Sequence, residues 1–401
     1  MSVGRLSSFP IAINPPLLVW AREESGYPVE RVAKGVQVKE ERILEWERGE
    51  RQPSMRQIEN LAKFFHRPLS IFFLPTPPKL PPLAAEYRRL PKVIPGQESP
   101  ELRLALRQML LRRESALELM DDLGEAVTPF ALRAYQQEGA EAVAKRLRQE
   151  LGISVQEQLA WPNEWRAWNA WRDAAERLGV LVFQFSRVPL TEARGLALLR
   201  TPMPVVGINS KEMAESKAYT LLHEIAHLML SAAHEEEPAI KELRSDSEWA
   251  AVERFAEHVA SLALVPEEAL RSVISQMGLT RGPWSFENIR KLARRFRITP
   301  LATATRLASS GYMTWPQYNA WRKAWDEFVA ALPKRRGGVA TQAQKAVNRN
   351  GKPYTTLVLG ALAANHITSV DAARFLNLKF HHFDELRTRL VQGPGNEAVN
   401  E

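Results

Sequence analysis

The 401-residue chain contains no cysteine. This absence excludes disulfides, a thiol nucleophile and every zinc site built from cysteine, so a bound metal would have to be held by histidine and carboxylate side chains. Histidine is also scarce, with only 8 residues in the chain. The search for metal ligands is therefore confined to a few positions.

Long apolar runs are missing as well. No stretch reaches the roughly 18 consecutive apolar residues of a membrane-spanning helix, and residues 1–18 lack the charged start, apolar core and small-residue cleavage site of a secretory signal. We therefore expect a cytoplasmic protein with no membrane partner. Hydrophobic and charged residues make up 45% and 25% of the chain, which is ordinary for globular proteins, and the length allows about two or three domains.

Positive charge is distributed unevenly along the chain. The net charge is +8, and residues 334–390 carry ten Lys or Arg against three acidic residues, whereas residues 1–75 carry eleven against nine. The C-terminal end would therefore attract an anionic partner such as DNA most strongly. A solvated basic surface without a partner gives the same pattern.

The N-terminal residues 1–75 show the apolar spacing of a small all-α domain. Five short helices are expected, at Pro16–Glu24, Pro28–Lys34, Lys39–Glu47, Ser54–Phe65 and Leu69–Phe73. The tight connection Gly35–Val38 joins the second helix to the third. Two helices joined by such a turn inside a small bundle form a helix-turn-helix arrangement.

The segment Ile43–Phe65, ILEWERGERQPSMRQIENLAKFF, resembles the XRE (Cro/repressor) family of helix-turn-helix domains. The resemblance implies DNA as a partner, and the candidate DNA contacts are Lys39, Arg42 and Arg48. The family usually has glycine in the turn, where φ is positive, and the spacing puts Gln37 there.

Acidic residues on the expected recognition helix favour a different partner. Glu40, Glu41 and Glu45 lie on this helix and would repel DNA phosphates. A helical module for dimerisation or for docking a protein is therefore an equal alternative, and a homodimer remains open.

A proline-rich segment follows the N-terminal domain. Leu74–Leu90 contains five prolines and is typical of an extended, semi-rigid linker, which we place at residues 76–98. Three helices and then three short strands are expected beyond it. They are the helices Pro100–Leu123, Ala140–Leu151 and Glu164–Leu178 and the strands Val180–Phe185, Gly195–Leu199 and Pro204–Ile208.

The most distinctive motif follows the strands, at Leu221–Leu230, LLHEIAHLML. His223 and His227 are four residues apart, so on a helix both imidazoles leave one face and can share a metal ion, with Glu224 beside them. This is the HExxH signature of zinc peptidases.

A catalytic zinc needs a third protein ligand, which we expect on the helix Glu248–Val265. Glu253 lies at the edge of the apolar stripe of this helix, and an ionised glutamate buried there without a partner would be costly. Glu257 lies further toward the polar side and is the second choice. His234 and His258 are candidates for oxyanion stabilisation, although each is more readily explained as a surface histidine.

Three blocks of sequence are similar to the ImmA/IrrE metallo-endopeptidases. They are Ile208–Ser210 (INS), the helix ending in HEIAHLML, and the block from Glu253 to Pro266. The resemblance implies His223, His227 and Glu253 as zinc ligands, with Mn²⁺ as the alternative metal, and Glu224 as the general base. The chain departs from the family pattern at Glu257 and Val259, where the family has Asn and Phe.

The strand before the motif could bind substrate. In zinc peptidases an edge strand beside the active-site helix commonly holds the substrate backbone by strand addition. Gly195, Leu196 and Ala197 are the candidates for that role, and a purely structural sheet is the alternative.

Helices continue to the C-terminus. They are expected at Glu267–Met277, Phe286–Phe296, Pro300–Ser309 and Thr314–Leu332, which would complete a peptidase domain at residues 99–332. A basic hinge at residues 333–338 then begins a basic helical region, residues 333–401. Its segment Ile367–Leu386 has a turn at Asn377 and could be a second helix-turn-helix, with Lys379, Arg387 and Arg389 nearby for anion contact.

The sequence therefore predicts a mainly α, multidomain protein. An all-α helix-turn-helix bundle would precede an α+β zincin-like metallopeptidase domain with a small sheet and a helical C-terminal region. The family resemblance implies a zinc endopeptidase that regulates transcription or a stress response by site-specific cleavage of a protein substrate, an XRE-type repressor. The alternative is a DNA-binding transcriptional regulator or antitoxin whose peptidase-like domain serves as a sensor.

Overall fold

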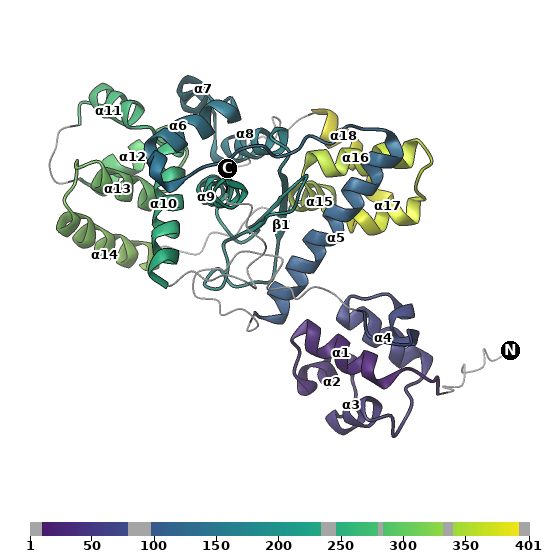
Figure 1. Cartoon of the computed structure of the whole chain (residues 1–401). Coiled ribbons are helices and arrows are strands. Elements are labelled where there is room, and N and C mark those ends of the chain that lie inside the picture. The colour runs from purple at the N-terminus through teal and green to yellow at the C-terminus, as the bar shows by residue number, and fades with distance from the viewer. Residues whose placement is uncertain (1–9, 79–97, 234–245, 280–283, 332–339, 393–401) are drawn as a thin grey trace. The chain divides into compact units, whose positions relative to one another are not determined.

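The computed structural model describes residues 10–78, 98–233, 246–279, 284–331 and 340–392 (Figure 1). The expected proline-rich linker lies mostly outside these residues, as does the basic hinge at 333–338. The chain forms two compact units, residues 1–85 with 91–108 and residues 86–90 with 109–401. As expected, helices dominate and are accompanied by one small sheet. Within the described ranges, no helix has the length and apolar character needed to span a membrane.

The first unit contains the expected helical bundle. Its elements are α1 (Pro15–Ser25), α2 (Val29–Val36), α3 (Glu40–Glu47), α4 (Met55–Phe65) and the 3-10 helix η1 (Leu69–Phe73). Leu18, Ile43, Trp46 and Phe65 meet in its core and are almost completely buried. Burial of these large side chains provides the main driving force for folding of the bundle.

The turn between α2 and α3 has the expected backbone. Gln37 adopts a left-handed conformation with φ of 60°, where the sequence places it at the usual glycine position. Ser54 and Gln57 form a capping box at the start of α4, which satisfies backbone N–H groups that the first helical turn leaves unpaired.

The N-terminal turns of α5 (Pro100–Leu123) belong to the same unit as the bundle. Arg107 donates a hydrogen bond to the carbonyl of Phe65 at 2.7 Å and lies 3.3 Å from the carboxylate of Glu24. Arg67 pairs with the same carboxylate. Glu24 thus links α1 to the end of α4 and to α5.

The second unit contains the remainder of α5 and most of the helices. They are α6 (Ala140–Leu151), α7 (Val155–Ala160), α8 (Glu164–Arg177), α9 (Ala214–Ala233), α10 (Asp246–Leu264), α11 (Glu267–Gln276), α12 (Phe286–Phe296), α13 (Pro300–Ser309), α14 (Trp315–Ala331), α15 (Gln342–Asn350), α16 (Lys352–Ala363), α17 (Ser369–Leu376) and α18 (Phe383–Gln392), with short 3-10 helices η3 (Gln136–Glu138) and η5 (Phe380–His382). The short helix α7 and the pair α15 and α16 were not anticipated from the sequence.

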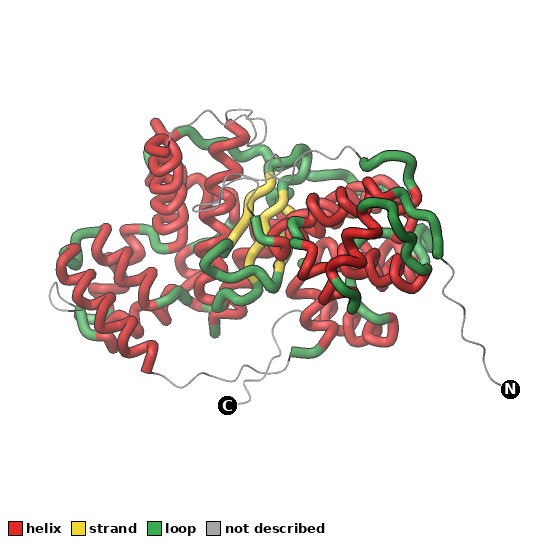
Figure 2. The backbone as a smooth tube through the Cα atoms, turned by 90° about the horizontal axis from the view of Figure 1, so that it is seen from below, coloured by secondary structure: helices red, strands yellow, loops and turns green. Residues whose placement is uncertain are grey.

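The three strands form one sheet with the order β1-β3-β2. They are β1 (Leu181–Phe185), β2 (Gly195–Leu198) and β3 (Val205–Asn209), and they agree closely with the expected ranges. β3 is parallel to β1 and antiparallel to β2, so β2 lies at one edge. Figure 2 shows these strands enclosed by helices.

The two faces of the sheet contact different helices. On one face, Ala197, Val206 and Ile208 share an apolar core with Leu221 and Ile225 of α9. On the other face, Phe183 meets Tyr354 of α16 edge to face, with ring centroids 5.6 Å apart. Because α9 also packs against α8 and α10, it is enclosed on several sides.

Arg172 on α8 connects the sheet to the C-terminal helices. Its guanidinium donates to the carbonyl of Val182 in β1 and, at 2.8 Å, to that of Asn348 in α15. It also pairs at 3.0 Å with Glu176, whose pKa is raised by burial to about 7 against the opposing effect of Arg172. Gly351, the residue before α16, lies against this pair with φ of 80°.

We predict that Gly351→Ala destabilises the protein by roughly 2–6 kcal/mol, from backbone strain together with overpacking. A methyl group there would lie 2.5 Å from Glu176 Oε1 and 2.8 Å from Arg172 Nη2. The matched control is Gly139→Ala, because Gly139 also precedes a helix with φ of 79° but has nothing within 4 Å of the added carbon.

Gly139→Ala introduces backbone strain without a steric contact, so it should lower the free energy of unfolding by only about 1–3 kcal/mol. Denaturant unfolding of both variants measures the difference. Equal losses would show that the contact with Arg172 and Glu176 does not constrain this position.

Candidate functional site

Helix α9 carries three polar side chains of the HEIAH motif in an otherwise apolar helix. Leu221, Leu222 and Ile225 are completely buried. His227 and Glu224 are only 4% and 7% exposed, so these polar groups are also largely removed from water. Such groups need polar partners in the interior.

Glu253 on α10 supplies the third donor. Its carboxylate oxygens lie 3.4 Å from Nε2 of His223 and 3.2 Å from Nε2 of His227. The two Nε2 atoms are 3.0 Å apart. Within the described ranges, these three residues form a group whose donor atoms all lie within 4.8 Å of one another and could hold a metal ion.

The donor set fits a zinc ion in type and spacing. Two imidazole nitrogens and one carboxylate oxygen are the ligands of many catalytic zinc sites, and ligand bonds of about 2.0–2.2 Å in tetrahedral geometry separate donors by roughly 3.3 Å. The observed separations lie between 3.0 and 3.4 Å. The three side chains therefore already have the spacing that a shared ion requires.

The charges of the group are strongly coupled. Burial would raise the pKa of Glu253, but its hydrogen bonds with His223 and His227 outweigh burial and hold that pKa well below its usual range. Burial would lower the pKa of His223, but Glu253 and Glu224 raise it. Tyr219 stacks on the His223 ring at a centroid distance of 6.3 Å, and burial raises the pKa of its phenol.

The second-choice ligand Glu257 is exposed and is not part of the three-donor group. His258 is also exposed on α10, and His234 lies outside the described residues. The structure therefore brings together the first-choice set, His223, His227 and Glu253.

Glu224 faces the sheet at the point where β2 begins. A Cβ atom added to Gly195 would lie 2.5 Å from Glu224 Oε1 and 2.6 Å from Cγ2 of Thr220. Gly195 therefore permits a close approach between the β2 backbone and α9. Because Glu224 is not among the three donors, its carboxylate can serve as a base beside them.

The register of β2 shows which backbone groups face its open edge. Asn209 donates its backbone N–H to the carbonyl of Arg194 at 2.8 Å, which makes this a hydrogen-bonded pair of the antiparallel ladder. Such pairs alternate, so Leu196 also bonds to β3, while the N–H and C=O of Gly195 and Ala197 point away from it. Of the three candidate substrate contacts, the backbone groups of Gly195 and Ala197 thus point toward the edge, although all four residues of β2 are buried.

Two sets of polar contacts fix the segments that flank β2. Neither was predicted from the sequence. Asn209 is completely buried and donates from Nδ2 to the carbonyls of Val188 and Ala193, at 3.1 and 2.8 Å. The only sequence signal for this role was the INS block, because a loop contact leaves no periodic pattern.

The second contact connects β2 to the start of α9. Glu212 accepts a hydrogen bond from Thr220 at 2.9 Å and pairs with Arg194 at 3.2 Å. Burial raises the pKa of this carboxyl against the opposing hydrogen bonds. The sequence did not predict this contact, because Glu212 lies just before the helix and is not part of its periodic pattern.

In the first unit, the candidate DNA contacts lie among carboxylates. Arg42 pairs with Glu45 at 3.1 Å and Arg48 with Glu50 at 3.2 Å. Lys39 is exposed at the N-cap of α3, directly before the exposed Glu40. The positive charge of this face is therefore partly neutralised, as the sequence suggested.

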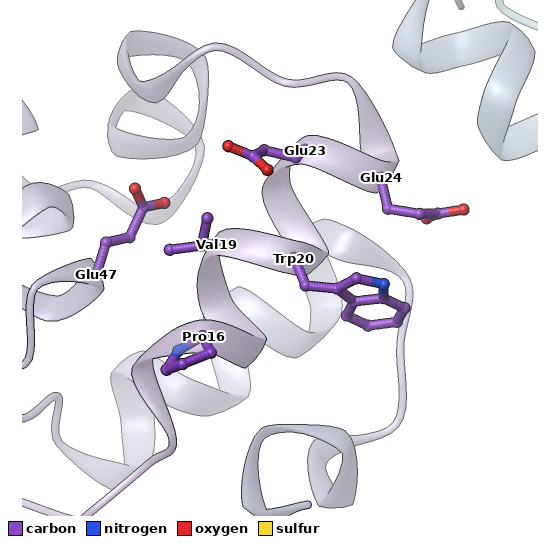
Figure 3. Close-up of a pocket in the computed structure, with 6 residues that line it drawn as sticks. All are labelled: Pro16, Val19, Trp20, Glu23, Glu24 and Glu47. Atoms are coloured by element: carbon purple, nitrogen blue, oxygen red, sulfur yellow. The ribbon is translucent and has the colours of Figure 1, made fainter. Parts of the chain in front are cut away.

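A hollow of about 330 Å³ lies on α1 of the same unit (Figure 3). Its carboxylates already have cationic partners, since Glu47 pairs with Arg22 at 2.6 Å and Glu24 with Arg107 at 3.3 Å. The residues lining it are Pro16, Val19, Trp20, Glu23, Glu24 and Glu47.

Comparisons with known families agree with this division of the chain. Residues 18–72 match the helix-turn-helix family model, and residues 175–308 match the IrrE N-terminal-like domain of peptidase family M78. No curated protein matches the chain. The second match covers the whole sheet, α9, α10 and the three donors, and its family implies a metal cofactor. The chain therefore joins an XRE-type helix-turn-helix domain to an ImmA/IrrE-like metallopeptidase domain.

Proposed function

We propose that the protein is a zinc-dependent endopeptidase in which His223, His227 and Glu253 hold the metal and Glu224 is the general base. The observation that carries this proposal is the convergence of the three donor atoms within 4.8 Å beside a carboxylate that faces an edge strand. Two histidines and one glutamate leave a fourth coordination position open for water or substrate.

The chain's own residues account for the steps of peptide hydrolysis. A bound Zn²⁺ would supply Lewis acidity and a water of lowered pKa. Glu224 accepts a proton from the attacking water, whose oxygen bonds to the scissile carbonyl carbon. When the C–N bond breaks, Glu224 delivers the proton to the leaving amine. Its burial against β2 keeps the carboxylate in one position for both transfers.

The β2 edge would hold the substrate. An extended peptide can add to the N–H and C=O groups of Gly195 and Ala197, which point away from β3. Because Gly195 lies against Glu224, a peptide bound to this edge would pass beside the general base. Main-chain pairing of this kind binds many sequences, so selection of a particular protein has to come from elsewhere.

The attached helix-turn-helix domain suggests the substrate class. We propose that the peptidase cleaves an XRE-type repressor at a specific site and thereby regulates transcription or a stress response. A domain of the same type as the target can recruit it by pairing, and the mixed charges on α3 suit a protein surface better than DNA phosphates.

We predict that Glu253→Ala lowers Zn²⁺ affinity by more than about 100-fold, since even outer-shell partners of a metal typically contribute 10–100-fold. Glu257→Ala is the matched control, because it removes an exposed carboxylate from the same helix. Competition calorimetry with Zn²⁺ and Mn²⁺ on the metal-free protein measures the affinities and identifies the preferred ion. Comparable losses in the two variants would contradict the ligand assignment.

Glu224→Gln should retain Zn²⁺ but lose about 10²–10⁴-fold in cleavage rate, because the amide cannot accept the proton. Purified zinc-loaded wild type and variant are incubated with XRE-type repressors from the same genome, and products are identified by mass spectrometry. The peptidase proposal is contradicted if the wild type cuts no repressor but binds a specific DNA at physiological salt. That result would favour a DNA-binding regulator whose peptidase-like domain is a sensor.

Gly195→Ala should reduce kcat while Zn²⁺ affinity stays within about threefold, because the new methyl group displaces Glu224 and not the three donors. Gly207→Ala is the control, since it meets Met109 Sδ at the same 2.5 Å on the opposite face of the sheet. Steady-state kinetics and thermal unfolding are compared for both. Similar kcat values in the two variants would show that the close approach at Gly195 does not position the base.

A further inference from the structure

The C-terminal helices α16 to α18, drawn in yellow in Figure 1, lie beyond both regions matched by family models. α17 has eight residues and is followed by its C-cap Asn377, a non-glycine residue with φ of 46°. In the N-terminal domain, α2 also has eight residues and is followed by its C-cap Gln37 with φ of 60°. Left-handed non-glycine residues also follow α4 and α12, at His66 and Arg297, so this conformation alone does not relate the two segments.

The two turns share a backbone pattern, which the turn after α12 also has. Val38 donates its N–H to the carbonyl of Ala33 at 3.0 Å, and Leu378 donates to Ala373 at 3.0 Å. The next residue is a lysine in extended conformation in both segments, Lys39 as the N-cap of α3 and Lys379 as the N-cap of η5. η5 leads directly into α18, so the second helix of the pair starts at the same position.

The correspondence extends through most of the apolar core. Seven of the nine buried positions of α1, α2 and α3 have a buried apolar counterpart 340 residues later; the exceptions are Ser25, whose counterpart Asn365 is exposed, and Ala33, whose counterpart Ala373 is half-buried. These pairs are Leu17 and Leu357, Leu18 and Val358, Ala21 and Ala361, Val32 and Ala372, Val36 and Leu376, Ile43 and Phe383, and Trp46 and Leu386. The pattern of buried positions in α16–α18 therefore resembles that of the helix-turn-helix core.

The outward faces of the two copies also correspond. The exposed positions Glu40, Glu41, Leu44 and Arg48 of the first copy match exposed positions in the second, namely Phe380, His381, Asp384 and Thr388. The opposite side of α18 is covered by α15, through contacts of Glu385 with Thr341 and of Arg389 with Gln344. The face left open is thus the one that reads DNA in a helix-turn-helix.

The chemistry of this face differs between the copies. Two carboxylates, Glu40 and Glu41, follow Lys39 in the first copy, whereas Phe380 and His381 follow Lys379 in the second. The exposed carboxylate Asp384 is paired at 3.2 Å with Arg387. The second copy therefore has fewer carboxylates at the start of its recognition helix to repel phosphates, although Asp384 remains exposed, and it offers Phe380, 54% exposed, for contact with a thymine methyl group.

We propose that α16–α18 is a second helix-turn-helix module and that the face formed by Lys379, Phe380, His381 and Thr388 binds duplex DNA. Lys379 at the turn contacts a phosphate, and the first turn of the recognition helix faces the major groove. This module is separate from the metal site, so the proposal does not depend on the peptidase activity.

The test uses the full-length protein and duplexes of about 30 base pairs selected from a random-sequence pool by repeated binding to it. Fluorescence anisotropy is measured over a series of salt concentrations. Lys379→Glu should weaken binding about 10-fold and reduce the salt slope by about one unit, as expected for a lost phosphate contact. Lys323→Glu, at an exposed position on α14, is the control for net charge and should leave binding unchanged.

Two further variants locate the contact. Phe380→Glu with His381→Glu installs the carboxylates of the first copy at exposed positions and should abolish selective binding. Lys39→Glu makes the same charge change at the equivalent position of the first copy. It therefore shows how much DNA binding depends on the first copy. Thermal unfolding confirms that each variant is folded.

The proposal is overturned if Lys379→Glu and the double variant bind the selected duplexes as tightly as wild type. It is also overturned if the full chain retains no duplex at roughly 0.15 M salt. In that case, loss of a bound protein partner from the double variant would assign the same face to protein docking.

Discussion

The enclosure of α9 is the constraint on which the candidate site depends. This helix packs against the sheet, α8 and α10, yet it carries two histidines and a glutamate. Removing such groups from water is unfavourable unless they find polar partners. Glu253 on α10 lies close enough to both imidazoles to provide one, and their 3.0–3.4 Å separations suit a shared ion. The same packing that buries α9 therefore positions the donor group.

The sheet contributes to the site through its edge and not through its side chains. β2 approaches α9 so closely that only glycine fits at position 195. Asn209 holds the preceding loop, and the contact of Arg194 with Glu212 connects the strand to the start of α9. The proposed general base, the donor group and the proposed substrate edge thus belong to one packed arrangement, in which a small displacement of β2 would move Glu224 more than the three donors.

The two helix-turn-helix segments show how one core can carry different surfaces. Most of their buried positions agree in spacing and burial, although the side chains change, for example from Ile43 and Trp46 to Phe383 and Leu386. Burial depends on apolar character and approximate volume, so such replacements preserve the fold. The exposed positions are not constrained in this way. One copy can therefore present carboxylates where the other presents an aromatic ring and a histidine.

The sequence alone predicted most of the helices, the three strands and the metal-binding set, because periodicity and the HEIAH spacing are local signals. It placed Glu253 above Glu257 from its position on an apolar stripe, and the structure brings Glu253 beside the two histidines. It also placed Gln37 at the turn position where φ is positive. It did not anticipate α15 and α16, nor the strand order. The turn at Asn377 had already indicated a second helix-turn-helix. The roles of Gly195, Asn209 and Glu212, and the correspondence of α16 to α1, needed the tertiary structure. Each depends on which segments distant in the chain lie in contact, and only packing decides that.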